Sequence, residues 1–385
     1  MDLREEKRGI LNDVMKKGVT PSRTPLFLNL QGWIVYHGAG YGYEECVYNS
    51  DKLICAYEKA FSEYPADLYY DTGGFAFMGF SKLLGSEDYY LNEEKYSLNF
   101  KDICYLSEDE QLKLLASDPK KFLWNQFYVN KFKNLAGSNT KETISAYLSS
   151  TGEHFEKVAE MKERVENTAG CFFLSDVPMY QPAFDYLFQY IIGMKGISMA
   201  MRRKSDLLIS ALDGFEELFG KYMDEQTPPL SLEMPFQNQI CLLGQTITNP
   251  RQFGPFIWNY MKKRIDKMAQ QGKIYFMVEG AGSALLDTLE DIPKGVCALH
   301  IEKDELGDLV SRFSDRFTYV GGMPVSLLGS GTAEECCRYA ERLMDEYGPS
   351  GNYIFSTDKG IVFETDAKPE NLKALCKTVS QHRSY

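Results

Sequence analysis

The stretch that decides the fold of this chain is Lys273–Glu302, KIYFMVEGAGSALLDTLEDIPKGVCALHIE. It opens with an apolar run of strand length, Ile274–Val278, which ends on Glu279 and a glycine-rich turn. A helix-like segment follows, and then a second short apolar run that ends on His300. Strand, polar tip, helix, strand and polar tip form the order of a β/α unit, so the stretch predicts parallel strands joined by helices.

The two polar tips are candidate functional residues. In a parallel β/α protein the carboxyl ends of the strands lie on one face, where active sites are built. We therefore expect Glu279 and His300 to stand side by side. An acid and an imidazole in that position could form part of a zinc site or an acid/base pair. A solvated glutamate and a capped histidine explain the same spacing, because no established motif contains this pair.

Strand-like and helix-like segments continue to alternate beyond this stretch. From residue 231 onward they follow each other four times, with connections short enough for right-handed βαβ units. The 385 residues exceed the usual size of a single core but suit a barrel with insertions. We therefore predict an α/β fold, a (β/α)8 TIM barrel formed by residues 1–385 as one domain, with extra helices in the N-terminal half at about 75–170. A doubly wound sheet is the alternative, although no GxGxxG fingerprint follows a strand.

An aromatic segment near the N-terminus is a candidate substrate-binding region. Thr24–Tyr36 has the character of a strand and runs into the loop HGAGYGYEE. Glycines allow the backbone to approach a ligand, and the aromatic side chains beside them could line a pocket. The candidate substrate-binding residues are Trp33, Tyr36, His37 and Tyr41. A surface turn with packed tyrosines fits the same pattern equally well.

Composition narrows the class of protein. The net charge of −12 argues against a nucleic-acid binder, because neutralising phosphates requires clustered Lys and Arg. No apolar run approaches the ~20 residues of a membrane span, and the charged N-terminus MDLREEKRG does not resemble a secretion signal. Nine cysteines without a paired framework favour a reducing compartment. We therefore expect a cytoplasmic protein with no nucleic-acid or membrane partner.

Several segments resemble a known family. They are FQYIIGMKGISMAMRRKSDLLISAL at 188–212, TNPRQFGPFIWNYMKKRID, KIYFMVEG, YVGGMPVSLLGSGTAEECCRYAERLMDEYG, GNYIFSTDKGI and DAKPENLKALCKTV. Together they are similar to the uroporphyrinogen decarboxylase superfamily, over roughly residues 180–385 and only weakly over the first third. The superfamily contains tetrapyrrole decarboxylases and zinc-dependent, corrinoid-linked methyltransferases.

The resemblance implies the second of these two branches. True decarboxylases bind substrate carboxylates with an arginine-rich RQAGR-type motif after the first strand, whereas this chain reads NLQGWIVYHG there. Methyltransferases that act on methanol or methylthiols carry an HxC pair at the strand end where this chain reads VEGAG. The remaining sub-branch, the first methyltransferases of anaerobic O-demethylase systems, replaces the thiolates with carboxylate and histidine ligands. Glu279 and His300 match that spacing.

The resemblance also implies a zinc ion and its ligands. Glu279 and His300 are the first two expected ligands, and both are the expected catalytic residues. The third ligand is open between Cys241, Asp358 and Glu302. Cys241 is favoured because it closes the preceding strand, although a buried cysteine is often only a small hydrophobic side chain.

The expected function follows from that sub-branch. The enzyme would demethylate a methoxylated aromatic compound and pass the methyl group to cobalamin, with zinc assisting cleavage of the ether. The chain has no corrinoid-binding DxHxxG pattern, so the cobalamin would come from a partner corrinoid protein. A homodimer is a possible assembly. The alternatives are a decarboxylase, a zinc-dependent methyltransferase for another methyl donor, and a barrel that binds an aromatic ligand or a corrinoid protein without catalysis.

Overall fold

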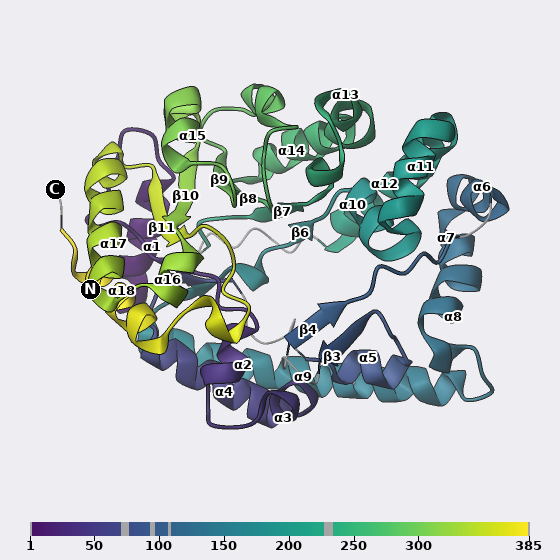
Figure 1. Cartoon of the computed structure of the whole chain (residues 1–385), viewed down its shortest axis with the longest axis horizontal. Coiled ribbons are helices and arrows are strands. Elements are labelled where there is room, and N and C mark those ends of the chain that lie inside the picture. Colours follow the sequence, from purple (N-terminus) through teal and green to yellow (C-terminus); the bar gives the residue numbers. More distant parts are fainter. Residues whose placement is uncertain (1, 71–76, 93–96, 107–108, 227–233, 384–385) are drawn as a thin grey trace.

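The structure is a computed structural model that describes residues 2–70, 77–92, 97–106, 109–226 and 234–383. Within these residues the chain forms a mixed α/β structure with parallel strands and many helices (Figure 1). Six parallel strands lie in the order β11-β10-β9-β8-β7-β6. Their bounds are β6 Met179–Tyr180, β7 Asn238–Leu242, β8 Ile274–Val278, β9 Cys297–Ile301, β10 Thr318–Met323 and β11 Tyr353–Thr357.

A second group of parallel strands continues this arrangement. It has the order β1-β2-β5, with bounds β1 Phe27–Leu28, β2 Leu68–Tyr69 and β5 Phe172–Phe173. A parallel bridge between Leu26 and Phe355 joins β1 to β11. On the other side, the side-chain amide of Gln239 in β7 donates to the carbonyls of Leu174 and Val177, at 3.2 and 2.7 Å, in the segment between β5 and β6. These contacts and the parallel order are consistent with the TIM-barrel arrangement expected from the sequence.

The strands separate two hydrophobic clusters, which shows which way their side chains point. One cluster contains alternate residues of several strands, namely Phe27, Leu68, Phe172, Tyr275, Met277, Ala298, Val320 and Ile354. The residues between them, such as Phe276 and Leu299, belong to the larger cluster under the helices. Because successive side chains of a strand point to opposite faces, Cys241, Glu279 and His300 share the face of Tyr275 and Ala298.

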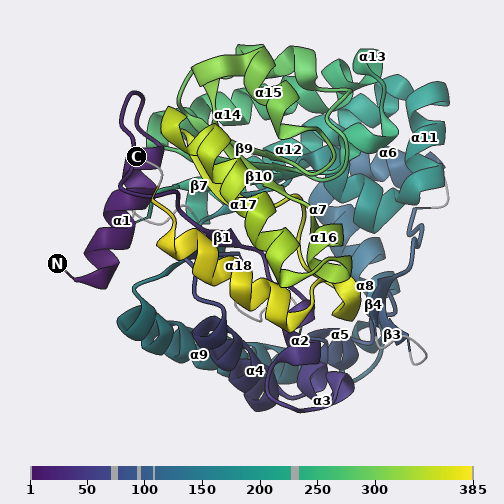
Figure 2. The ribbon, with the colours of Figure 1, turned by 60° about the vertical axis from the view of Figure 1, so that its left-hand side comes forward.

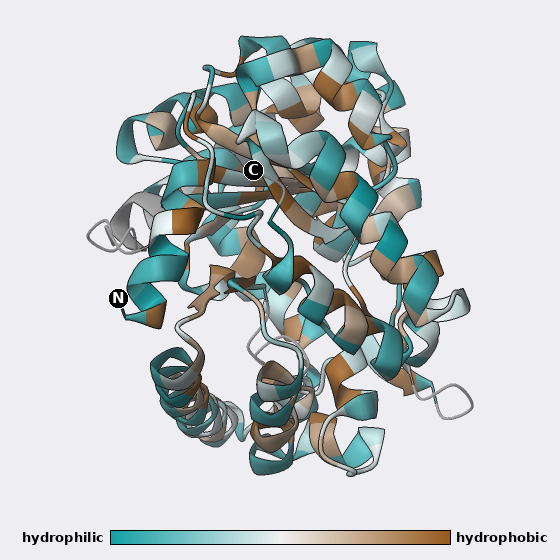
Figure 3. Cartoon of the chain, turned by 90° about the vertical axis from the view of Figure 1, so that its left-hand side faces the viewer, coloured by the Kyte–Doolittle hydropathy of each residue, from teal (hydrophilic) through white to brown (hydrophobic). Residues whose placement is uncertain are grey.

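Helices cover the outer face of the strands. In Figure 2, α17 and α18 lie side by side across the front of the molecule. Figure 3 shows hydrophobic residues concentrated in the interior strands, with hydrophilic residues on the outer sides of the helices. The longest helices are α1 Leu3–Val14, α4 Ser50–Glu63, α9 Thr140–Ala169, α11 Gly193–Arg203, α12 Ser205–Gln226, α14 Asn259–Gln271, α17 Ala333–Tyr347 and α18 Pro369–Gln381. None of the helices, as far as the structure describes them, is long and apolar enough to cross a membrane.

The N-terminal half contains the predicted extra helices and one element that was not predicted. Helices α5 Gly79–Leu84, α6 Asp109–Ser117, α8 Tyr128–Lys131 and α9 lie within residues 77–170. An antiparallel hairpin of β3 Tyr89–Asn92 and β4 Ser97–Phe100 accompanies them, next to α5 in Figures 1 and 2. The strand predicted over Thr24–Tyr36 was wrong in extent. Only Phe27–Leu28 is a strand, and Trp33–His37 forms the short helix α2, which buries Trp33.

Candidate functional site

Strand register decides which residues meet at the carboxyl end of β8. Met277 pairs with His300 and Val278 pairs with Ile301. The residue that follows beside Glu279 is therefore Glu302, and the Glu302 N–H donates to the Val278 carbonyl at 3.2 Å. The expectation that Glu279 and His300 stand side by side was wrong. The sequence located both strand ends, but β9 continues past His300, which places the imidazole two residue pairs deeper in the sheet than Glu279.

His300 is buried, and both nitrogens of its ring have hydrogen-bond partners. Its Nε2 is 3.0 Å from the carbonyl oxygens of both Thr357 and Asp358. A carbonyl only accepts, so Nε2 carries the hydrogen, and Nδ1 accepts from the Tyr275 hydroxyl at 2.8 Å. Burial lowers the pKa of His300 to about 4, and the ring is neutral at pH 7. Both ring nitrogens are engaged, as in the capped-histidine interpretation of the sequence.

A glycine makes room for this imidazole. Gly321 in β10 has φ +115°, a conformation that residues with a side chain rarely adopt. A Cβ at Gly321 would lie 3.2 Å from the Nε2 of His300. Gly321 of YVGGM therefore makes room for His300, whereas a Cβ at Gly322 would meet Leu306 and Leu343 instead.

Cys241 and Glu279 do meet. The Cys241 thiol at the end of β7 donates to Oε1 of Glu279, with Sγ and Oε1 3.0 Å apart. The Glu279 backbone is fixed by its N–H, which donates to the Leu242 carbonyl at 2.9 Å, and by Gln245, whose side-chain amide donates to the Glu279 carbonyl at 2.5 Å. Burial, and then the Glu279 carboxylate, raise the pKa of Cys241 well above its ordinary value. Cys241 is therefore a protonated thiol at neutral pH.

Glu302 completes what we call the acid–thiol cluster: Cys241, Glu279 and Glu302. Oε2 of Glu302 accepts from the Gly280 N–H at 2.8 Å. Burial raises the pKa of Glu302 and the nearby Glu279 carboxylate raises it further, while the Gly280 hydrogen bond and Lys359 oppose the shift. Two carboxyl groups that share a partly buried site cannot both ionise easily, which favours a proton on one of them.

A buried carboxyl group, Asp185, fixes the backbone that follows the strand carrying Cys241. It is completely buried at the start of the helical segment after β6 and accepts from the N–H groups of Leu243 and Gly244, at 2.6 and 3.0 Å. Burial raises its pKa to about 7 despite these hydrogen bonds, and the Glu279 charge contributes. The Leu243–Gly244 turn directly follows Cys241's strand, so Asp185 holds that strand end in place. No sequence signal marked Asp185.

Two tyrosines, which we call the phenol pair, lie near the cluster, within range of its charges. Tyr89 comes from the β3–β4 hairpin and Tyr190 from a π-helical turn, Leu187–Ile192. Their hydroxyls share a hydrogen bond. Burial raises the pKa of both phenols; the Glu279 charge adds to the shift of Tyr89, and Cys241 adds to that of Tyr190. Both phenols are protonated at neutral pH. Sequence reasoning missed them because the hairpin was not predicted, although π-helical turns often mark functional sites.

The predicted zinc ligands do not come together as a set of three. Among the residues that the structure describes, no group of three or more His, Cys, Asp and Glu side chains is arranged to hold a metal ion. Cys241 and Glu279 are in contact, but both nitrogens of His300 are engaged below them. The donor set therefore does not fit a zinc ion bound through His300.

The four predicted substrate-binding residues lie on or beside α2. Trp33 is completely buried, and its indole N–H donates to the Ala367 carbonyl at 2.8 Å. His37 packs on Trp33, and its Nε2 is 3.1 Å from the Glu364 carbonyl. Tyr36 is half-buried and stacked on Tyr43 with ring centroids 4.4 Å apart. Tyr41 is exposed, beneath the Lys52 ammonium.

Several buried polar atoms have no hydrogen-bond partner in the described structure. They are both side-chain amide atoms of Asn29, Oε1 of Gln245 and Oγ of Ser356. Gln245 contacts Glu279 through its other amide atom, while Asn29 and Ser356 lie on or just beyond the neighbouring strands β1 and β11. A bound water or a polar ligand group would satisfy such atoms.

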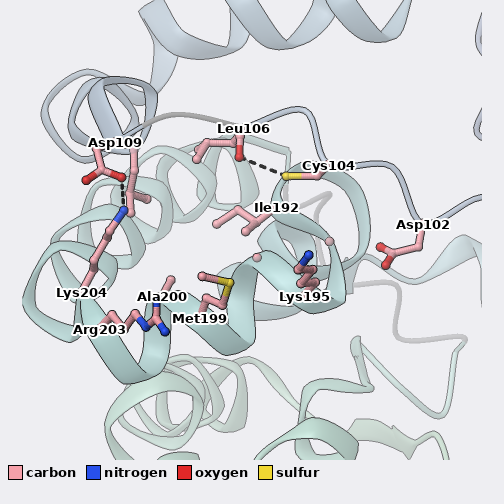
Figure 4. A pocket seen from close by; sticks show the side chains of 13 residues that line it. Asp102, Cys104, Leu106, Asp109, Ile192, Lys195, Met199, Ala200, Arg203 and Lys204 are labelled. Carbon is pink, nitrogen blue, oxygen red and sulfur yellow. Dashed lines mark hydrogen bonds and ion pairs between the residues drawn. The ribbon is translucent and has the colours of Figure 1, made fainter.

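A separate cavity of about 560 Å³ lies outside the strands, between the segment after β4 and helix α11 (Figure 4). Asp102, Lys195 and Arg203 line it, and a Lys204–Asp109 ion pair lies at one end. Its lining includes no member of the acid–thiol cluster or the phenol pair. This cavity is therefore distinct from the candidate site.

Comparison with known proteins places the chain in a family. The sequence model described as Uroporphyrinogen decarboxylase (URO-D) matches residues 186–382. The chain belongs to this family. The match covers β7 to β11, and so includes all members of the acid–thiol cluster.

A solved structure agrees with the fold of this URO-D family member. A methyltransferase from Methanosarcina mazei has 15% sequence identity and a TM-score of 0.59, over 99% of each chain. At this identity the likeness is one of fold, and it extends over the N-terminal half that the family model does not match. No curated protein sequence matches the chain.

Proposed function

We propose that this URO-D family member is a methyltransferase that demethylates a methoxylated aromatic compound. The methyl acceptor is the cob(I)alamin of a separate corrinoid protein, which docks at the carboxyl ends of the strands of a closed barrel. The observation that carries the proposal is the acid–thiol cluster, in which the Cys241 thiol donates to Glu279 and the pKa of the neighbouring Glu302 is raised, with the hydrogen-bonded phenol pair nearby. The fold shared with a methyltransferase supports it.

Cleavage of an aryl methyl ether needs a proton more than it needs a nucleophile from the enzyme. The electron pair of cob(I)alamin forms the new bond to the methyl carbon, and the C–O bonding pair leaves on the oxygen. Phenoxide is a poor leaving group, so a proton or hydrogen bond delivered to that oxygen lowers the barrier. The products are the free phenol and the methylated corrinoid, and water returns the proton to the enzyme.

Glu302 is the proposed proton donor, and the phenol pair supplies hydrogen bonds to the same oxygen. The pKa of Glu302 is raised, whereas proton loss from Tyr190 is too costly for it to be the acid. Glu279, which accepts a hydrogen bond from the Cys241 thiol, lies beside Glu302 and raises the pKa of its carboxyl group. This division of roles between two neighbouring carboxyl groups is a common arrangement in acid–base enzymes.

Zinc is a proposed cofactor, and the proton transfer described for Glu302 does not depend on it. Cys241 and Glu279 are the two predicted ligands in contact, and a zinc ion there would act as a Lewis acid on the ether oxygen. His300 would have to exchange its hydrogen bonds with Tyr275 and the strand β11 carbonyls to become the third ligand.

Decarboxylation is the second candidate function, favoured by the family match. Carboxylate substrates need charge-assisted pairing, usually to arginine. The sequence NLQGWIVYHG at 29–38 contains no arginine, which argues against a tetrapyrrole with several carboxylates.

The test is a direct reaction. Incubation of the protein with a methoxylated phenol and reduced cobalamin, free or on a corrinoid protein, is expected to yield methylcobalamin and the demethylated phenol in equal amounts. The cobalamin spectrum follows the first product and chromatography the second. Release of carbon dioxide from a carboxylated substrate, with no methyl transfer from any methoxyarene, would support the decarboxylase instead.

A further inference from the structure

We propose that Lys131 is a positioning residue for the candidate site: its ammonium group, paired with Asp88 and surrounded by aromatic rings, holds Tyr190 and Tyr89 in the positions in which their hydroxyls share a hydrogen bond near the acid–thiol cluster. This inference goes beyond the proposed function because it concerns the geometry of the phenol pair. Only its effect on turnover rests on that function.

The setting of Lys131 is unusual for a lysine. Its side chain at the end of α8 is only 12% exposed, and its ammonium forms an ion pair with Asp88, whose side chain is 1% exposed. Four aromatic rings surround the same nitrogen. Their centroids lie 5.2 Å (Tyr190), 5.4 Å (Phe127), 5.8 Å (Phe132) and 6.0 Å (Tyr105) from it. Within about 6 Å a cation is attracted by the face of each ring.

Asp88 connects this cation to the hairpin that carries Tyr89. It directly precedes Tyr89, the first residue of β3, and its carbonyl accepts from the Lys101 N–H at 2.7 Å across the hairpin. The other oxygen of the Asp88 side chain accepts from the Tyr105 hydroxyl. Lys131 and Tyr105 therefore fix the point at which the chain enters β3, and with it the position of the Tyr89 ring.

Tyr190 is one of the four rings around Lys131 and also a member of the phenol pair. Its ring is the closest of the four to the Lys131 ammonium, and its hydroxyl shares a hydrogen bond with Tyr89. Tyr105 also pins the π-helical turn of Tyr190, because its N–H donates to the Ile191 carbonyl at 2.8 Å. One cation thus sets the positions of two tyrosines that come from different parts of the chain.

Replacement of Lys131 by a neutral residue should allow Tyr89 and Tyr190 to move from their positions. Lys131→Met keeps the length of the side chain but removes the attraction to the rings and leaves Asp88 as an unpaired buried carboxylate. The double variant Lys131→Met/Asp88→Asn removes that stranded charge and keeps an acceptor for Tyr105, so it preserves folding if the single variant does not. Lys133→Met is the matched control, because Lys133 pairs with Glu87 one residue before Asp88, and both are exposed.

The first readout needs no substrate. Alkylation of Cys241 by iodoacetamide at pH 9, followed by peptide mass spectrometry on protein as purified, reports whether displacement of the phenol pair changes access to the thiol. We expect alkylation to accelerate roughly tenfold in Lys131→Met and in the double variant, and to be unchanged in Lys133→Met. Equal rates in all four proteins would overturn the proposal.

A double-mutant cycle distinguishes positioning of the phenol pair by Lys131 from an effect of Lys131 on the stability of the whole protein. In a Tyr190→Phe background, which lacks the hydroxyl that reaches Tyr89, we expect Lys131→Met to change Cys241 alkylation and methyl transfer much less than in the wild-type chain. If the Lys131→Met effects stay equally large in that background, Lys131 acts through stability alone and the proposal fails. If the wild-type protein transfers no methyl group while the alkylation pattern holds, the proposed function fails and the positioning role stands.

Discussion

The thiol of Cys241 donates a hydrogen bond to Oε1 of Glu279, with 3.0 Å between the two heavy atoms, and so joins the ends of β7 and β8. Burial, and then the Glu279 carboxylate, raise the pKa of this thiol, and Glu279 also raises the pKa of Glu302. The two residues were predicted as metal ligands, and the structure brings them together without the third member, His300.

Replacement of Glu279 should be the most damaging single change to activity at this site. Glu279→Gln removes the charge that raises the pKa of Glu302, and we expect kcat/KM for methyl transfer to fall ~100-fold or more, within the range for losing an acid–base group. Cys241→Ala should cost less, because the carboxylate remains. Glu290→Gln, on the helical turn after β8, is the control. Equal activity of Glu279→Gln and the wild-type protein would exclude Glu279 from the reaction.

Elemental analysis of protein purified without a metal-binding tag tests the zinc prediction. Because both His300 nitrogens are engaged, we expect zinc taken up after supplementation to be lost in Cys241→Ala and Glu279→Gln but retained in His300→Gln. Zinc lost in His300→Gln, with folding unchanged by circular dichroism, would show that the imidazole rearranges to bind the metal as the sequence suggested.

His300 should contribute to the dependence of stability on pH. Its folded pKa, about 4, lies below the value of about 6.5 expected in the unfolded chain. Between these values the unfolded chain binds more protons, so this stability is fully present above pH 6.5 and is lost as the pH falls towards 4. The loss is on the order of 3 kcal/mol by that linkage.

Asp185 has the opposite effect on the pH dependence of stability between pH 4 and 7. The contribution of His300 must therefore be measured as a difference between the wild-type chain and a variant. Its pKa of about 7 exceeds that of an unfolded aspartate, so stability from the neutral carboxyl is lost as the pH rises towards 7. Denaturant unfolding of the wild-type chain and His300→Gln from pH 4 to 7 isolates the histidine. The two curves should converge towards low pH, and parallel curves would contradict the burial of a neutral His300.

The sequence located the strands β8 and β9 but not the register between them, and it missed the hairpin of β3 and β4. Alternation of apolar runs and polar tips located β8 and β9 and the residues at their ends. It could not show that β9 extends to Ile301, because a buried histidine with two hydrogen bonds and a solvated one look alike in a sequence. Tyr89 and Tyr190 were missed for a different reason. They are brought to the site by tertiary packing of segments about one hundred residues apart, which no local periodicity reports.

A substitution at Gly244 tests whether Asp185 packs against the turn that follows β7. A Cβ at this position would lie 2.3 Å from Oδ1 of Asp185 and 2.7 Å from the Phe184 ring. Gly244→Ala must displace one of them, and we expect a loss of about 1–3 kcal/mol in the free energy of unfolding together with reduced activity. Gly254→Ala is the matched control, because nothing lies within 4 Å of a Cβ there. Equal unfolding midpoints in denaturant for the two variants would show that Asp185 is not packed as described.

The role of Glu302 as proton donor can be tested through the leaving group. An acid whose pKa is raised is protonated below that pKa, so the rate should fall as the pH rises through it, and Glu302→Gln should remove this alkaline decline. A phenol that is itself acidic needs little help to depart. We therefore expect Glu302→Gln to slow demethylation of ordinary methoxyphenols by ~100-fold or more but to affect nitro-substituted methoxyarenes far less. Glu305→Gln, three residues away and exposed, controls for loss of charge. The same fractional loss for both substrate classes would mean that Glu302 shapes the site without giving a proton, and the acid would then have to be sought elsewhere in the cluster.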